Sequence, residues 1–83
     1  MTISTGDVRE LLETEAPNAV LVLVEGRTAV IGAGQLASEQ YRGALEVISR
    51  DNLIKQLGGT EPSGHELAEQ AAILDSAVSE MGG

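Results

Sequence analysis

The sequence contains no cysteine and only one aromatic side chain besides histidine, Tyr41. Neither disulfides nor cysteine-ligated metals can therefore add to its stability. A chain of 83 residues is expected to form one domain, and it buries only somewhat more than the ~60% of surface that a 60-residue chain buries. Because Phe and Trp are also absent, we expect a thin core. Association between copies of the chain would bury further apolar surface and so add to stability.

Positive charge is scarce as well. The sequence has 13 acidic and 5 basic residues, a formal net charge of -8, and its basic residues are scattered along the chain. Affinity for nucleic acid comes from cations that displace phosphate counterions and from aromatic rings that stack on bases. The composition therefore argues against nucleic-acid binding and predicts an acidic, soluble surface. A lesser hypothesis is an acidic decoy that captures the basic partner of a nucleic acid.

Long apolar runs are missing too. The longest, residues 19–24, has six residues, whereas a membrane-spanning helix needs about twenty. The negative charge also disfavours anionic membrane surfaces. The first residues contain neither the basic cluster nor the apolar stretch of a secretory signal. We therefore expect a cytoplasmic protein with no membrane partner.

The first part of the chain predicts a helix. Ser4 or Thr5 can accept hydrogen bonds from the amides of its opening turn, and Pro17 ends it. Its apolar residues follow helical spacing and form one stripe: Val8, Leu11, Leu12 and Ala16.

A β-hairpin is expected next. Residues 19–25 are nearly all Val or Leu, residues 28–33 form a second apolar run, and Gly26 between them supplies the positive φ of a tight turn. Because successive side chains of a strand point to opposite faces, both faces of this sheet are apolar. Both need covering.

Residues 35–48 allow two interpretations. One is a single helix, which Gly43 would weaken by roughly 1 kcal/mol. The other, which we favour, is a short helix over 36–42 followed by a strand over 44–48. Ser49 then caps a helix over 50–57, which ends at Gly58. Residues 58–62 form a linker inside the single domain, residues 1–83.

The last helix has the clearest local signature. Ser63 and Glu66 form a capping box that places its start. Apolar residues then repeat at spacings of four and three, as in a short heptad pattern: Leu67, Ala71, Leu74, Val78 and Met81. We expect this stripe to pack on the domain's own sheet, and the alternative is a seam with a second copy.

The segment Val30–Ala37 resembles the dinucleotide-binding fingerprint, a strand that leads into G-x-G-x-x-A, with an acid nineteen residues after the first glycine. The resemblance implies phosphate or nucleotide binding by the Gly32-Ala33-Gly34 loop, with Asp51 on the ribose. A hairpin precedes the motif, and the crossover is shorter than usual. A structural role for Gly32 and Gly34 is therefore the first interpretation, and ligand binding is the alternative.

The remaining chemistry-bearing residues form no constellation that predicts catalysis. His65 is the only histidine, and with Glu69 it could supply two metal ligands, with Glu61 or Glu66 as a third. Such a site would be unusual without further His or Cys. No nucleophile with a base, and no pair of carboxylates, stands out at suitable spacing. We expect no enzyme activity, metal or cofactor.

The sequence thus predicts a small α+β domain: a helix, a β-hairpin, a short third strand and two C-terminal helices. We expect a non-enzymatic interaction, assembly or accessory module that acts as a homo-oligomer, most simply a dimer, with a further protein partner that the sequence does not identify. Its interface would use the uncovered sheet face or the stripe of the last helix. The candidate interface residues are Leu21, Leu23, Leu67, Ala71, Leu74, Val78 and Met81.

Overall fold

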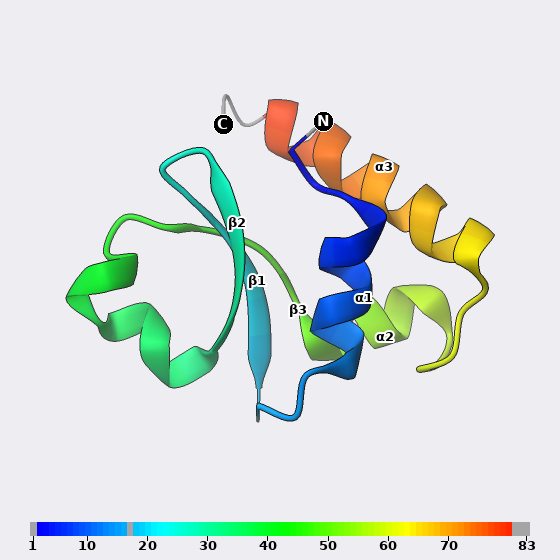
Figure 1. Cartoon of the computed structure of the whole chain (residues 1–83), viewed down its shortest axis with the longest axis horizontal. Helices are drawn as coiled ribbons and strands as arrows, with labels where there is room; N and C mark the ends of the chain where they lie inside the picture. The colour runs from blue at the N-terminus through cyan, green and yellow to red at the C-terminus, as the bar shows by residue number, and fades with distance from the viewer. Residues whose placement is uncertain (1, 17, 81–83) are drawn as a thin grey trace.

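A three-stranded sheet lies between a layer of α-helices and a layer of short 3-10 turns (Figure 1). The computed structural model describes residues 2–16 and 18–80. The predicted α+β class is confirmed. In chain order the elements are α1 (Thr5–Glu13), β1 (Ala19–Val24), β2 (Arg27–Gly32), η1 (Ala33–Ala37), η2 (Glu39–Tyr41), β3 (Leu45–Ser49), α2 (Arg50–Leu57) and α3 (Gly64–Glu80).

The predicted hairpin forms the centre of the sheet. The strand order is β2-β1-β3, and β1 pairs antiparallel with both neighbours. Val24 pairs with Arg27, so the turn between them has two residues, Glu25 and Gly26, with φ of 51° and 76°. Positive φ at both positions is the type I′ geometry, whose twist matches that of the strands. Gly26 was predicted in this role, whereas Glu25 was not.

The segment after β2 follows the favoured interpretation, with one correction. A third strand is present as Leu45–Ser49, but the expected helix over 36–42 is replaced by two 3-10 turns, η1 and η2. The register of β3 shifts between Leu21 and Val22, which pair with Ile48 and Glu46. Val47 is therefore the extra residue of a β-bulge.

The larger core lies between one face of the sheet and all three α-helices. It joins the N-terminal segment, the inward stripes of the helices and alternate residues of the strands. Its buried members are Ile3, Val8, Leu11, Leu12, Ala19, Leu21, Leu23, Ile48, Leu53, Leu67, Ala71, Leu74 and Val78.

A smaller core lies on the opposite face of the sheet. Val20, Val22 and Ile31 are buried there, and Leu36 and Tyr41 from the 3-10 turns pack against them. We expected part of a sheet face to remain uncovered for a partner. The segment that connects β2 to β3 crosses this face (Figure 1) and covers its three buried residues, while Ala29 and Tyr41 remain only partly buried.

The helix ends combine predicted and unpredicted contacts. Ser4, Ser49 and Ser63 cap α1, α2 and α3 through their side chains. The αL conformation at the C-terminus of α2 falls on Gly58, as expected. The first helix, however, ends at Glu13 and not at Pro17.

The earlier end of α1 has two structural causes. Thr14 has an extended backbone, and its Oγ1 accepts a hydrogen bond from the N–H of Ala16 at 3.3 Å. The guanidinium of Arg50 donates from Nε and Nη2 to the carbonyl of Leu12, at 3.1 and 3.0 Å. If α1 continued, the carbonyl of Leu12 would accept a hydrogen bond from an amide in the next helical turn. The side chain of Arg50 in α2 supplies the donors in its place.

Candidate functional site

The residues that the sequence offered as an interface lie inside the single chain. Leu21 has an exposed fraction of 0%, and the other described members of that set are also buried in the larger core. The stripe of α3 packs on the domain's own core, which was the favoured alternative for this helix. A second copy of the chain would therefore need a different surface. The buried members are Leu21, Leu23, Leu67, Ala71, Leu74 and Val78; Met81 lies outside the described residues.

The glycine motif does not form a phosphate cradle. Gly32 has φ of -75°, and its N–H donates to Oε1 of Gln35 at 2.9 Å, so this amide is already occupied. The helix that follows is a 3-10 turn of five residues. Asp51 is exposed in the first turn of α2, across β1 from Gly32 in the strand order β2-β1-β3. Gly34 is exposed, and a Cβ added there would meet no atom within 4 Å.

His65 and Glu69 lie on the surface of α3. Their Nε2 and Oε2 atoms are 3.8 Å apart, and their side chains are 89% and 66% exposed. Within residues 2–16 and 18–80, no group of three or more His, Asp or Glu side chains is placed to hold a metal ion.

The outer edge of β2 has the backbone geometry of an unfilled pairing site. Val24 and Arg27 flank the two-residue turn and so form a hydrogen-bonded pair. In an antiparallel ladder the hydrogen-bonding direction alternates along the strand. The N–H and C=O groups of Thr28, Val30 and Gly32 therefore point away from β1.

The bond from Gly32 to Gln35 supports this assignment, because it requires the Gly32 amide to point outward. Thr28 and Val30 have no comparable cap, and no described segment pairs with this side of β2. Figure 1 views the sheet edge-on, with β2 in front of β1, and no described segment crosses in front of β2. These two residues thus offer two donors and two acceptors.

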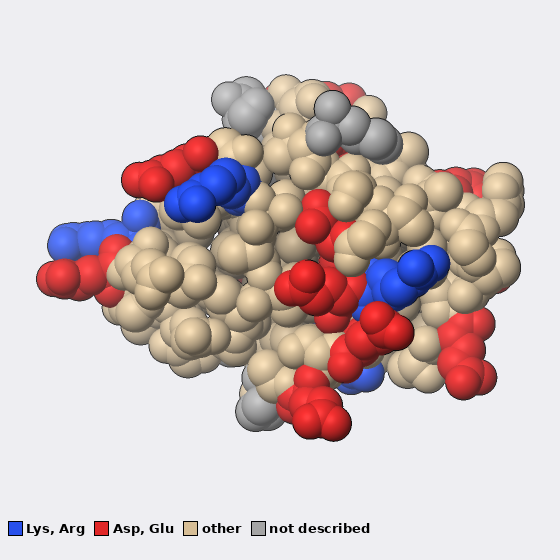
Figure 2. Space-filling view, in the orientation of Figure 1, with Lys and Arg blue, Asp and Glu red and all other residues tan. Residues whose placement is uncertain are grey.

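The surface along this edge carries little charge. From Thr28 to Gly32 the strand contains no acidic or basic residue. In the same orientation, Figure 2 shows charged side chains at the hairpin end and over α1, with uncharged surface between them. An uncharged strand edge is a template for pairing with another chain.

The opposite edge of the sheet is different. β3 has five residues, is interrupted by the bulge at Val47, and exposes the carboxylate residue Glu46. Short length, a bulge and an outward charge are features that discourage edge pairing. The two edges of one sheet therefore differ, and β2 has the one suited to a partner strand.

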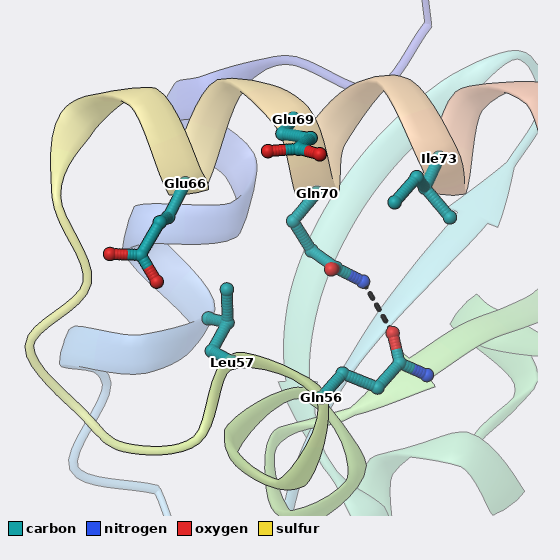
Figure 3. A pocket seen from close by; sticks show the side chains of 6 residues that line it. All are labelled: Gln56, Leu57, Glu66, Glu69, Gln70 and Ile73. Carbon is teal, nitrogen blue, oxygen red and sulfur yellow. Dashed lines mark hydrogen bonds between the residues drawn. The ribbon is translucent and has the colours of Figure 1, made fainter.

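A hollow of about 230 Å³ lies between α2 and α3 (Figure 3). Gln70 is buried at its floor and donates from Nε2 to Oε1 of Gln56, which links the two helices. The carboxylates of Glu66 and Glu69 stand at its rim, and Ile73 is 54% exposed beside it. This side-chain hydrogen bond adds to the packing of α2 and α3 in the larger core.

Asp75 has a role that the sequence reasoning missed. Its Oδ1 accepts hydrogen bonds from the N–H groups of Thr2 and Ile3, at 2.8 and 3.0 Å. These bonds, that of Ile3 first, hold the pKa of Asp75 below its usual range. The carboxylate anchors the N-terminal segment on α3, with Ile3 fully buried. The sequence shows that Asp75 lies off the apolar stripe of the last helix. It does not show that the carboxylate binds Thr2 and Ile3, which are more than seventy residues away.

Comparison with known proteins adds no functional information. No protein-family model, curated protein or solved structure matches this chain. None of the helices in the described residues is long and apolar enough to cross a membrane.

Proposed function

We propose that this chain is a non-enzymatic protein-interaction module that acts as a homo-oligomer, an assembly or accessory component built around a small sheet. The observation that carries the proposal is the open, uncharged edge of β2. Thr28 and Val30 there have outward N–H and C=O groups with no described partner.

The size of the domain supports the same conclusion. A chain of 83 residues with a single aromatic ring buries little surface for its length. Pairing of the β2 edge with another strand extends the sheet and satisfies backbone groups without any change to either core. The binding energy then comes from main-chain hydrogen bonds and adjoining side chains, as in recognition by strand addition.

Light scattering coupled to size exclusion tests the proposal directly. The expected mass at micromolar concentration is at least twice the 8.6 kDa of the chain, and sedimentation equilibrium over a range of concentrations gives the dissociation constant. A particle of 8.6 kDa throughout that range, with well-dispersed amide spectra, would show that the folded chain is a monomer and would overturn the proposal.

A further inference from the structure

We propose that the assembly is a symmetric dimer in which the β2 strands of two copies pair antiparallel, with Ala29 on the two-fold axis. This inference rests on the proposed function and adds to it the partner, the edge and the register. The result is a continuous sheet of six strands, three from each copy.

The register follows from the backbone groups that are available. An antiparallel two-fold pairing that places both Thr28 and Val30 opposite residues 26–32 of the second copy is centred on Thr28, on Ala29 or on Val30. Centring on Val30 places Thr28 opposite Gly32, whose N–H already donates to Gln35. Centring on Thr28 places Val30 opposite Gly26, which lies in the turn with φ of 76°. Centring on Ala29 places Thr28 opposite Val30 twice, and the outward N–H and C=O groups of these two residues then form four hydrogen bonds.

The side chains are compatible with the same register. Thr28 faces the second copy's Val30, a β-branched pair of the kind that stabilises adjacent strands. Arg27, the only charged residue of β2, faces the second copy's Ile31 and not the second copy's Arg27. No like charges are therefore opposed along the strand, and Ala29 faces its own symmetry mate.

These features favour a second copy over an unrelated extended peptide. Thr28 and Val30 lie at equal distances on either side of Ala29. When two copies of β2 pair antiparallel about Ala29, the outward groups of Thr28 in one copy therefore meet those of Val30 in the other. The Gln35 cap on Gly32 limits the pairing to the length that this register uses. The β3 edge, with its bulge and Glu46, offers no equivalent surface.

Single cysteines test the register, because the chain has no cysteine of its own. In the proposed dimer the two Ala29 residues form a non-hydrogen-bonded pair with Cα atoms about 4.5 Å apart, within the range that a disulfide spans. Ala29→Cys is therefore expected to form a covalent dimer under mild oxidation. In Val30→Cys the two sulfurs belong to diagonal neighbours roughly 7–8 Å apart, and Glu46→Cys lies on the other edge; neither is expected to cross-link efficiently.

A backbone variant tests the hydrogen bonds. The N–H of Val30 points away from β1 and has no hydrogen-bond partner among residues 2–16 and 18–80, so Val30→Pro removes a donor that only the dimer uses. Dimer dissociation is expected to become easier by about tenfold or more, since two of four intermolecular bonds are lost. Ala29→Pro is the matched control, because the N–H of Ala29 points toward Val22 of β1; it is expected to unfold the chain.

The outcomes separate this inference from the proposed function. If the protein is a dimer but Ala29→Cys does not cross-link, or Val30→Cys cross-links in its place, the register is wrong while the proposed function stands. If the wild-type protein is a monomer, both are wrong. If Val30→Pro is folded by amide spectra and dimerises as tightly as the wild type, the edge is not the interface; should that variant unfold, the cross-linking comparison decides.

Discussion

Two charged side chains connect parts of the chain that hydrophobic packing alone leaves unpaired. Arg50 reaches from α2 to the last turn of α1, and Asp75 reaches from α3 to the amides of the N-terminal segment. In each case a charged group satisfies backbone groups that have no partner in their own element. Such charge-assisted bonds are stronger than neutral ones.

Arg50→Ala is expected to lower the free energy of unfolding by about 1–3 kcal/mol, because the carbonyl of Leu12 loses both bonds to the guanidinium. Urea unfolding measures the change. Lys55→Ala, an exposed position of the same helix, is the control and is expected to stay within about 0.5 kcal/mol of the wild type. Equal losses of unfolding free energy in Arg50→Ala and Lys55→Ala would show that the hydrogen bonds from Arg50 to Leu12 do not contribute to stability.

Asp75→Asn is expected to make the free energy of unfolding fall less steeply as the pH is lowered. The folded-state pKa of Asp75 is lowered, chiefly by the hydrogen bond from Ile3. Because the pKa is lowered in the folded state, the Asp75 carboxylate contributes to the free energy of unfolding at pH values above its unfolded-state pKa. This contribution is lost as the pH falls through the folded-state pKa, from about pH 4 downward. The wild type should therefore lose more stability than the variant in this range.

Chemical unfolding at a series of pH values measures that difference. Glu69→Gln removes one negative charge from the same helix, at a carboxylate that faces His65, and controls for net charge. The same acid slope in the wild type and Asp75→Asn would mean that the anchoring bonds do not depend on ionisation.

At the scale of the element, the hairpin turn carries local strain at one residue. Glu25 has φ of 51°, a conformation that Asn adopts more readily than Glu, while Gly26 adopts its φ of 76° without cost. The side chain of Glu25 is 80% exposed and 3.8 Å from Arg27, and an exposed pair of this kind adds little.

Glu25→Asn is therefore expected to stabilise the chain by about 0.5–1 kcal/mol, since Asn-Gly is a favoured type I′ sequence. Thermal and urea unfolding measure this gain. Gly26→Ala should change stability in the opposite direction, by about 1 kcal/mol or more, although a Cβ there meets no atom within 4 Å. A loss in both variants would contradict the assigned turn type.

Adjacent residues of α3 provide a matched pair for the core. Leu74 is buried in the larger core, and Ile73 is 54% exposed. Leu74→Ala is expected to cost about 2–5 kcal/mol of unfolding free energy, whereas Ile73→Ala should cost about 0.5 kcal/mol or less. Urea unfolding compares them. If Ile73→Ala weakened the dimer while the monomer remained stable, the outer face of α3 would be the interface.

At the scale of the whole molecule, charge opposes association. Each copy carries a formal net charge of -8, and Figure 2 shows charged side chains over α1 next to the uncharged strip. Two such copies repel one another through solvent, and salt screens this repulsion. Main-chain hydrogen bonds across the strand edges are short-range and are much less affected.

The dimer is therefore expected to tighten when salt is raised from about 0.05 to 0.5 M, a change in Debye length from roughly 14 to 4 Å. Sedimentation equilibrium at both concentrations measures the dissociation constant. Weaker association at high salt would indicate that ion pairs hold the copies together, and capture of a basic protein that salt abolishes would support the acidic-decoy hypothesis instead.

The features that could be predicted from the sequence are local ones. Ser49 and Ser63 cap helices, Gly26 turns the hairpin and Gly58 ends α2, because each depends on residues within a few positions. The interface residues could not be placed in this way. Leu21 and Leu74 have the same apolar spacing whether they face a partner or their own core, so periodicity shows a buried face without showing what covers it.

The sequence by itself determined the order of the elements, the two-sided apolar sheet and the absence of disulfides, since these depend on composition and on spacing along the chain. The tertiary structure decided the rest. It showed that the 3-10 turns within residues 33–41 cover one sheet face, and that Arg50 and Asp75 complete the backbone hydrogen bonds of distant segments. It also showed that β2, and not a helix stripe, presents backbone groups without a partner in the described part of the chain. These depend on which segments become neighbours after folding, and an edge is open only when no other part of the chain pairs with it.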